Sequence, residues 1–106
     1  MAFVKNSLTR KSQATLDKVT DLEDQIERLE NDIRRLKIEF DIFFNGGTNV
    51  APHRSRASLE ARIKRINGNR DLSFAMRYRL NALISRYTSY RELWRRRLSS
   101  MGEDVY

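Results

Sequence analysis

The chain has no cysteine, one histidine, one proline and four glycines in 106 residues. Without cysteine, neither a disulfide nor a thiolate metal site can stabilise the fold. A single histidine also excludes a Cys/His nucleophile pair, and a zinc site with three histidine or cysteine ligands from one chain. We therefore expect a non-enzymatic protein with no catalytic residues, no metal site and no cofactor.

Long apolar runs are also missing. No segment approaches the roughly 20 consecutive apolar residues that a membrane-spanning helix needs. At the start of the chain only Ala2 to Val4 form an apolar patch, which is too short for the hydrophobic region of a secretory signal. The sequence therefore predicts a soluble, cytoplasmic protein with no membrane span.

Charge, in contrast, is abundant. Charged residues make up 33% of the chain and hydrophobic residues 40%, a composition typical of helical and coiled-coil proteins. The net charge of +7 is uneven, because residues 1–45 hold eight Lys or Arg against nine Asp or Glu, whereas residues 46–106 hold thirteen against five. Nearly all the basic residues of the second half are arginines, whose guanidinium groups make bidentate contacts with phosphate and carboxylate.

Apolar residues in the first half of the chain recur at alternating spacings of three and four, which indicates a heptad seam on one long helix near residues 9–45. The seam consists of Val19, Leu22, Ile26, Leu29, Ile33, Leu36, Phe40 and Phe43. β-branched residues alternate with leucine over most of it, a pattern that favours a two-stranded parallel coiled coil. The same seam can instead pack against a later helix of the chain.

A second apolar stripe runs along a segment near residues 72–101. Its residues are Met76, Leu80, Leu83, Tyr87, Tyr90, Trp94 and Met101. Reversed in direction, this stripe pairs with the seam at constant register, from Phe43 beside Met76 to Ile26 beside Trp94. We therefore predict an antiparallel returning helix, with a short middle helix near residues 54–67 between the two.

The predicted fold is thus all-α, a single coiled-coil helical hairpin domain over residues 1–106 with frayed ends at 1–8 and 102–106. Each helix of such a hairpin buries only one stripe, so apolar flanks stay open to water. They include Phe40, Phe44, Tyr78, Ile84, Leu93 and Leu98. Pairing two hairpins in a four-helix bundle would cover these flanks, and we expect a dimer.

The stretch FFNGGTNVAPHRS, residues 43–55, joins two adjacent glycines to the only proline. A phosphate-binding P-loop follows a strand and carries Lys and Ser or Thr at fixed spacing, whereas these glycines follow a helix. We interpret the stretch as a glycine C-cap followed by a helix start, with Pro52 near the first turn. We expect Ser55 or Ser58 to cap the start of the middle helix and Gly68 to end it in the left-handed conformation. Asp71 or Ser73 should cap the start of the third helix.

The arginine-rich half predicts a surface for an anionic partner, either phosphate or an acidic protein. The candidate residues are Arg54, Arg56, Arg62, Lys64, Arg65, Arg95 and Arg96. Arginines also alternate with Tyr87, Tyr90 and Trp94, as in proteins that stack nucleic-acid bases. These aromatic residues lie on the apolar stripe, however, so packing is the favoured interpretation.

Two quoted stretches, IRRLKIEFDIFFNGG and FAMRYRLNALISRYTSYRELWRRRL, carry a resemblance. Together with the residues between them, they are similar to a bacterial family of small helical proteins with no assigned activity. In that family a long heptad helix ends in an aromatic-glycine turn, and a later helix rich in Arg, Tyr and Trp returns. The resemblance implies the helical fold and no particular activity.

Two functions follow from these patterns. The seam and the scarcity of catalytic residue types favour a structural or adaptor protein that self-associates through a coiled coil and binds a protein partner. The arginine-rich half favours, as the alternative, a protein that binds nucleic acid without sequence specificity.

Overall fold

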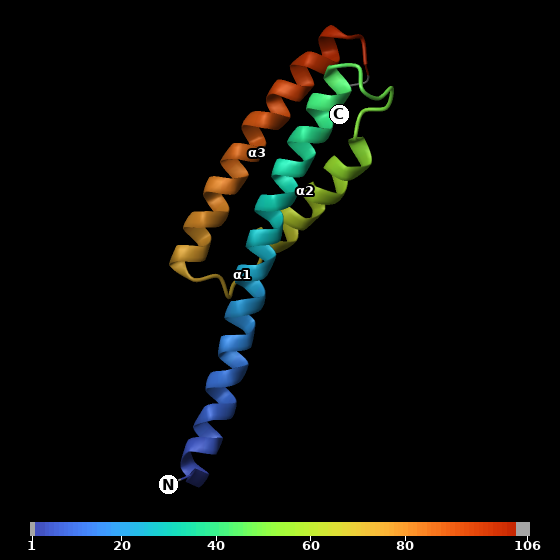
Figure 1. The fold of residues 1–106 in the computed structure, drawn as a ribbon. Coiled ribbons are helices and arrows are strands. Elements are labelled where there is room, and N and C mark those ends of the chain that lie inside the picture. The colour runs from blue at the N-terminus through green and yellow to red at the C-terminus, as the bar shows by residue number, and fades with distance from the viewer. Residues whose placement is uncertain (1, 104–106) are drawn as a thin grey trace.

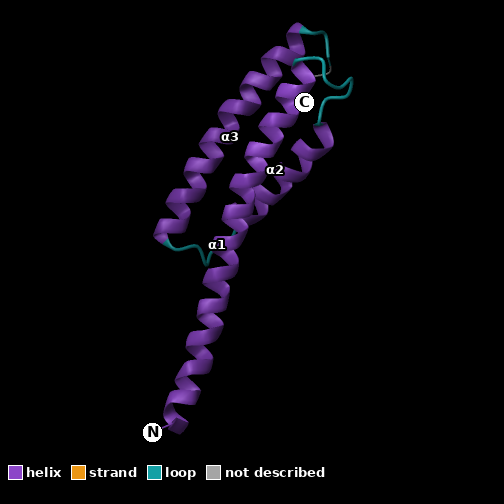
Figure 2. Cartoon of the chain, in the orientation of Figure 1, coloured by secondary structure: helices purple, strands orange, loops and turns teal. Residues whose placement is uncertain are grey.

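The computed structural model describes the backbone of residues 2–103 and the side chains of residues 16–103. Three helices follow one another along the chain: α1 (Ala2–Phe44), α2 (His53–Asn67) and α3 (Phe74–Ser100). The described residues contain no strand (Figure 2), so the predicted all-α class is confirmed. The three expected helices are all present, in the predicted order.

The helix ends agree with prediction except at the start of the chain. α1 begins at Ala2 rather than near residue 9. Residues 2–8 contain neither glycine nor proline, so nothing in that segment stops the helix. At the other end, residues 102 and 103 follow α3 as a turn and an irregular position, and residues 104–106 of the expected frayed end lie outside the described part of the chain.

The predicted seam forms the centre of the core. Seven of its eight residues, Leu22 to Phe43, are 5% exposed or less, and Val19 is partly buried against them. α2 contributes Leu59 and Ile66 to this core, and α3 contributes six further residues. They are Met76, Leu80, Leu83, Tyr87, Trp94 and Leu98. The seam is therefore buried within the chain from Leu22 onwards.

The predicted direction of the third helix is wrong. α2 runs back along α1, and α3 then turns again, so that α3 is parallel to α1 (Figure 1). Phe40 stacks on Trp94 with ring centroids 4.1 Å apart, and Arg97 lies over the Phe44 ring at 4.2 Å, which places the ends of α1 and α3 together. The physical reason is that two short connections, residues 45–52 and 68–73, each reverse the chain. The antiparallel partner of α1 is therefore α2.

The turn after α1 is a Schellman C-cap, as the glycine pair predicted. Gly46 adopts φ +82°, its N–H donates to the Phe43 carbonyl at 3.1 Å, and the Gly47 N–H donates to the Ile42 carbonyl at 2.8 Å. The left-handed conformation predicted for Gly68 is wrong, because its φ is −81°. Any residue can adopt this helical conformation, so α2 does not end because residue 68 is a glycine.

The two remaining cap predictions have different outcomes. Ser73 caps α3, accepting a hydrogen bond from the Met76 N–H at 3.1 Å. Neither Ser55 nor Ser58 caps α2, because that helix begins earlier, at His53, with Pro52 in the N-cap position and no side-chain cap. Proline sets the backbone there without donating a hydrogen bond.

The molecule is a rod of 70 × 22 × 16 Å. Three helices lie side by side at one end, whereas at the other end the N-terminal half of α1 continues alone, shown in blue in Figure 1. At residue 16, the first with a described side chain, Leu16 is 57% exposed. The core thus occupies only the half of the rod that α2 and α3 cover.

Candidate functional site

Two of the predicted anion-binding arginines on α2 form ion pairs with carboxylates of the same chain. Arg56 is paired with Glu60 at 3.2 Å, and its side chain is only 11% exposed. Arg62 reaches across to α1 and pairs with Asp32. Both guanidinium groups are therefore already engaged, that of Arg56 within α2 and that of Arg62 between α2 and α1.

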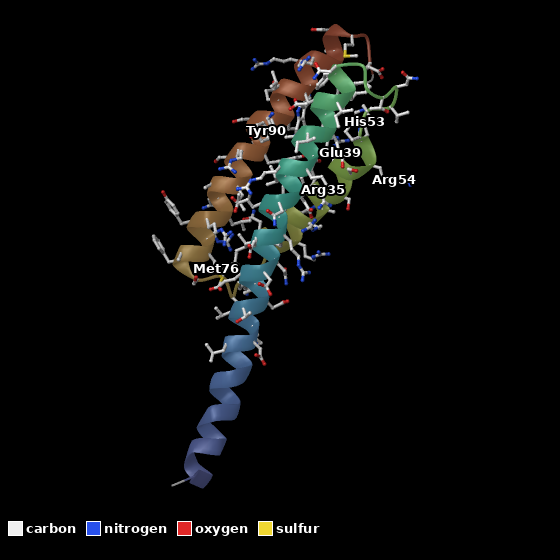
Figure 3. The ribbon with its side chains drawn as sticks, in the orientation of Figure 1. Arg35, Glu39, His53, Arg54, Met76 and Tyr90 are labelled. Atoms are coloured by element: carbon white, nitrogen blue, oxygen red, sulfur yellow. The ribbon has the colours of Figure 1, made fainter. Side chains whose placement is uncertain are left out.

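The other three basic residues of α2 point outwards. Arg54, Lys64 and Arg65 are exposed, and none of them forms an ion pair with another described residue. We name these three residues the α2 basic face. Arg54 stands at the start of α2, opposite Arg35 and Glu39 of α1, as Figure 3 shows.

An open groove of about 340 Å³ lies between α1 and α2. Its charged lining combines three arginines with two carboxylates, namely Arg35, Arg54, Arg62, Asp32 and Glu39. Ser55 and Ser58 contribute hydroxyl groups, and Leu36 and Leu59 form the apolar floor. Because charges of both signs line it, the groove has no marked preference for an anion over a cation.

The remaining predicted residues, Arg95 and Arg96, lie on α3. Their side chains are 46% and 75% exposed, and each lies at the outer limit of an ion pair with Glu92, at 4.0 and 3.8 Å. They stand near the end of α3, whereas Lys64 and Arg65 stand near the end of the antiparallel α2. The two pairs are therefore at opposite ends of the bundle, and the seven predicted residues do not form one surface.

Sequence reasoning missed Glu60, which joins α2 to α3. Its carboxylate accepts a hydrogen bond from the Tyr87 hydroxyl at 2.6 Å and pairs with Arg91 at 3.1 Å, in addition to Arg56 of its own helix. One signal for this role was available, since Glu60 is the only acidic residue between Arg54 and Arg70. A lone carboxylate among arginines is a natural centre for ion pairs.

Glu30 has a similar position between α1 and α3. It pairs with Arg34 at 2.8 Å and with Arg79 of α3 at 3.1 Å. The hydrogen bond from Arg79, helped by the charges of Arg34 and Arg86, holds the pKa of the Glu30 carboxyl below its usual value, against a smaller opposing effect of burial. The ion pair also supports the parallel alignment of the two helices.

Two aromatic residues at the start of α3 are the most exposed large apolar groups of the bundle apart from the loop residue Val50. Phe74 is 90% exposed and Tyr78 is 74% exposed. The open position of Tyr78 agrees with prediction, as does that of Leu93 at 50%, whereas the predicted open flanks at Phe40 and Leu98 are wrong because both are fully buried. Phe40 stacks on Trp94 and also contacts the His53 ring edge-on, with ring centroids 6.4 Å apart.

Within residues 2–103, no group of three or more His, Cys, Asp or Glu side chains is arranged to hold a metal ion. None of the helices in that range combines the length and the apolar character that crossing a membrane requires. Comparisons of the chain with protein-family models, with curated proteins and with solved structures found no match.

Proposed function

We propose that the chain is a cytoplasmic, non-enzymatic structural or adaptor protein that self-associates through its helices and binds a protein partner. The observation that carries this proposal is the N-terminal half of α1, which extends past α2 and α3 as a single helix (Figure 1). An isolated helix is marginally stable in water, since most helical stability in proteins comes from packing of an apolar face. A second chain alongside would supply that packing.

The surface of α1 close to the bundle supports the same role. Leu16 is exposed, and Val19 is only partly covered, so the apolar side of the helix continues beyond the point where the bundle ends. The exposed surface of this stretch is acidic, with Asp17, Asp21, Glu23, Asp24 and Glu27. An apolar stripe on one side of a helix with charged residues on the rest of its surface is typical of helices that pack on other helices.

The buried seam restricts how copies can pair. From Leu22 to Phe43 the seam residues face α2 and α3 of their own chain, so they are not open to a parallel coiled coil with a second copy. Self-association therefore involves the outer faces of the helices or the projecting part of α1.

Light scattering of the full chain tests this function. We expect a mass near twice 12.6 kDa in the micromolar range, together with a helical circular dichroism signal that rises with concentration as the projecting helix finds a partner. Leu16→Asp should shift the increase in mass and the increase in helical signal to higher protein concentration. A mass of 12.6 kDa throughout, with concentration-independent helicity, would show that the chain does not self-associate.

Binding of nucleic acid is the second candidate function, and the α2 basic face favours it. Three exposed cations on one helix, none paired with a described carboxylate, are available for phosphate groups. A gel shift with generic DNA and RNA at two salt concentrations should then show binding that weakens as salt rises.

A matched pair of variants locates any such binding. Replacing Lys64 and Arg65 together by serine should weaken it more than replacing Arg95 and Arg96, which already lie near Glu92. Absence of binding to wild-type protein at low salt would exclude this function.

A further inference from the structure

The solvent side of α3 carries an uncharged strip that begins with its two exposed aromatic residues. Exposed positions spaced by three and four residues define this strip, which we name the α3 outer face: Phe74, Tyr78, Ala82, Ser85, Ser89 and Leu93. Phe74, Tyr78 and Leu93 are 90%, 74% and 50% exposed. These six positions carry no charge, although the exposed residues Arg79, Arg86 and Glu92 stand beside them on α3. Exposed aromatic residues are also the commonest anchors of protein interfaces.

Arginines border the α3 outer face: Arg70 and Arg79 lie near its aromatic end, and Arg86 lies about two turns past Tyr78. Arg70, Arg79 and Arg86 are all exposed, whereas Arg77 is occupied with Asn67 and Asn69 at the turn between α2 and α3. Arg79 forms an ion pair with Glu30, which also pairs with Arg34. Arg70 and Arg86 form no ion pair with a described residue. An apolar anchor with a cationic border fits a partner that is acidic around an apolar centre.

The chain itself contains an acidic segment with one exposed apolar residue beside it. Residues 17–27 of α1, which we name the acidic segment, hold five carboxylates and one lysine, and Leu16 precedes them with an exposed side chain. All five carboxylate residues are exposed. The acidic segment thus complements the border of the α3 outer face in charge.

The position of these two surfaces along the rod allows them to meet in pairs. Contacts between the parallel helices, Glu30 with Arg79 and Phe40 with Trp94, place the start of α3 level with the acidic segment. Glu23 is the central residue of the helix that runs from Ala2 to Phe44. A two-fold axis at this level, perpendicular to the rod, would bring the acidic segment of each copy to the α3 outer face of the other. Such an isologous contact gives a closed dimer, in which the acidic segment and the α3 outer face meet at two equivalent places.

We propose that two copies of this chain pack antiparallel, with the acidic segment of each copy docked on the aromatic end of the other's α3 outer face. The projecting half of each α1 then lies along the bundle of the partner instead of in water. This inference rests on the proposed self-association and specifies its surface and its direction.

Cross-linking tests the contact, because the chain has no cysteine of its own. Two exposed positions receive a single cysteine each, Asp24→Cys in the acidic segment and Ala75→Cys between the aromatic anchors. Oxidation of their mixture should give the mixed disulfide at least roughly tenfold faster than a mixture of Asp24→Cys with Ala57→Cys, since a disulfide requires its two residues to be close neighbours. Ala57 is an exposed alanine on α2, so it is a matched control.

Charge exchange provides a second arm. The variants Asp24→Arg and Arg70→Glu should each raise the dissociation constant of the dimer roughly tenfold or more, while their mixture regains association, because opposite charges then face each other again. Phe74→Ser/Tyr78→Ser should weaken the dimer without loss of helicity, since both side chains are exposed in the monomer. Circular dichroism checks that every variant is folded.

The outcomes separate this inference from the proposed function. A dimer that shows the mixed disulfide, and whose charge-reversed variants rescue each other, supports the docking. A dimer of unchanged affinity in Phe74→Ser/Tyr78→Ser, with no cross-linking above the Ala57→Cys control, overturns the docking but leaves self-association intact. A monomeric wild-type chain overturns both.

Discussion

At the scale of single residues, periodicity predicted the core and missed the polar links. The eight seam residues were found from their spacing, and all of them lie in or against the core, because burial on a helix repeats every three or four residues. Glu60 and Glu30 could not be assigned in the same way. Their partners Arg91 and Arg79 are far away in the sequence, and a charge pattern does not state which helix faces which.

Glu60→Gln tests the link between α2 and α3. Removing the charge weakens the interactions with Arg56, Arg91 and Tyr87 at once, and we expect a loss of about 1 kcal/mol in the free energy of unfolding, a modest value because the pairs are partly exposed. Urea denaturation measures it. Glu92→Gln is the control, since Glu92 is 52% exposed with its arginines at 3.8 and 4.0 Å, and it should cost less than ~0.5 kcal/mol. Equal losses in the two variants would show that Glu60 has no special role.

Glu30 predicts a pH dependence with a definite sign. Because Arg79 holds the folded-state pKa of Glu30 below its usual 4.5, this carboxylate stabilises the fold above pH 4.5 and loses the contribution as the pH falls through the folded-state pKa. The wild-type chain should therefore be more stable than Glu30→Gln near neutral pH, and the difference should vanish in strong acid. Urea denaturation across the acid range measures both curves. A difference that stays constant with pH would contradict the assignment.

At the scale of elements, composition and capping residues predicted three helices and most of their ends. The glycine pair after α1 was interpreted correctly because a left-handed C-cap is a local property of the backbone. Gly68 was misjudged for the opposite reason: the same Asn-Gly signal there coincides with an ordinary helical φ of −81°. A dipeptide therefore indicates that a helix ends, but not which conformation ends it.

Gly46→Ala and Gly68→Ala form a matched pair that tests this difference. At Gly46, with φ +82°, alanine should cost about 1–2 kcal/mol of stability because a Cβ is disfavoured in the left-handed region, although no atom lies within 4 Å of it. At Gly68 the nearest atoms to a Cβ are at 3.5 and 3.7 Å, an ordinary contact, so alanine should be neutral or stabilise by up to ~1 kcal/mol. Thermal melts of both variants measure the costs. A larger loss at Gly68 than at Gly46 would contradict the two backbone assignments.

At the scale of the whole molecule, the direction of α3 was the main error of sequence reasoning. A stripe spaced by threes and fours reads the same in both directions, so the residues of α3 match the seam whether α3 runs parallel or antiparallel to α1. The deciding feature is connectivity: α2, at 15 residues, is long enough to bury Leu59 and Ile66 against α1 and to count as a full return of the chain. Two returns place the ends of α1 and α3 together and leave the other half of α1 to project.

The most direct test of this account is a pair of distances within one chain, because the parallel packing of α3 both buries the seam and leaves half of α1 without a partner. Spin labels at Asn45→Cys and Ser99→Cys, two exposed positions, should be close neighbours, while labels at Asn45→Cys and Ala75→Cys should be ~36 Å apart at about 1.5 Å per residue of α3. Dilution with unlabelled protein removes distances between chains. The reverse result, a short distance from residue 45 to residue 75 and a long one to residue 99, would show an antiparallel hairpin and contradict the account.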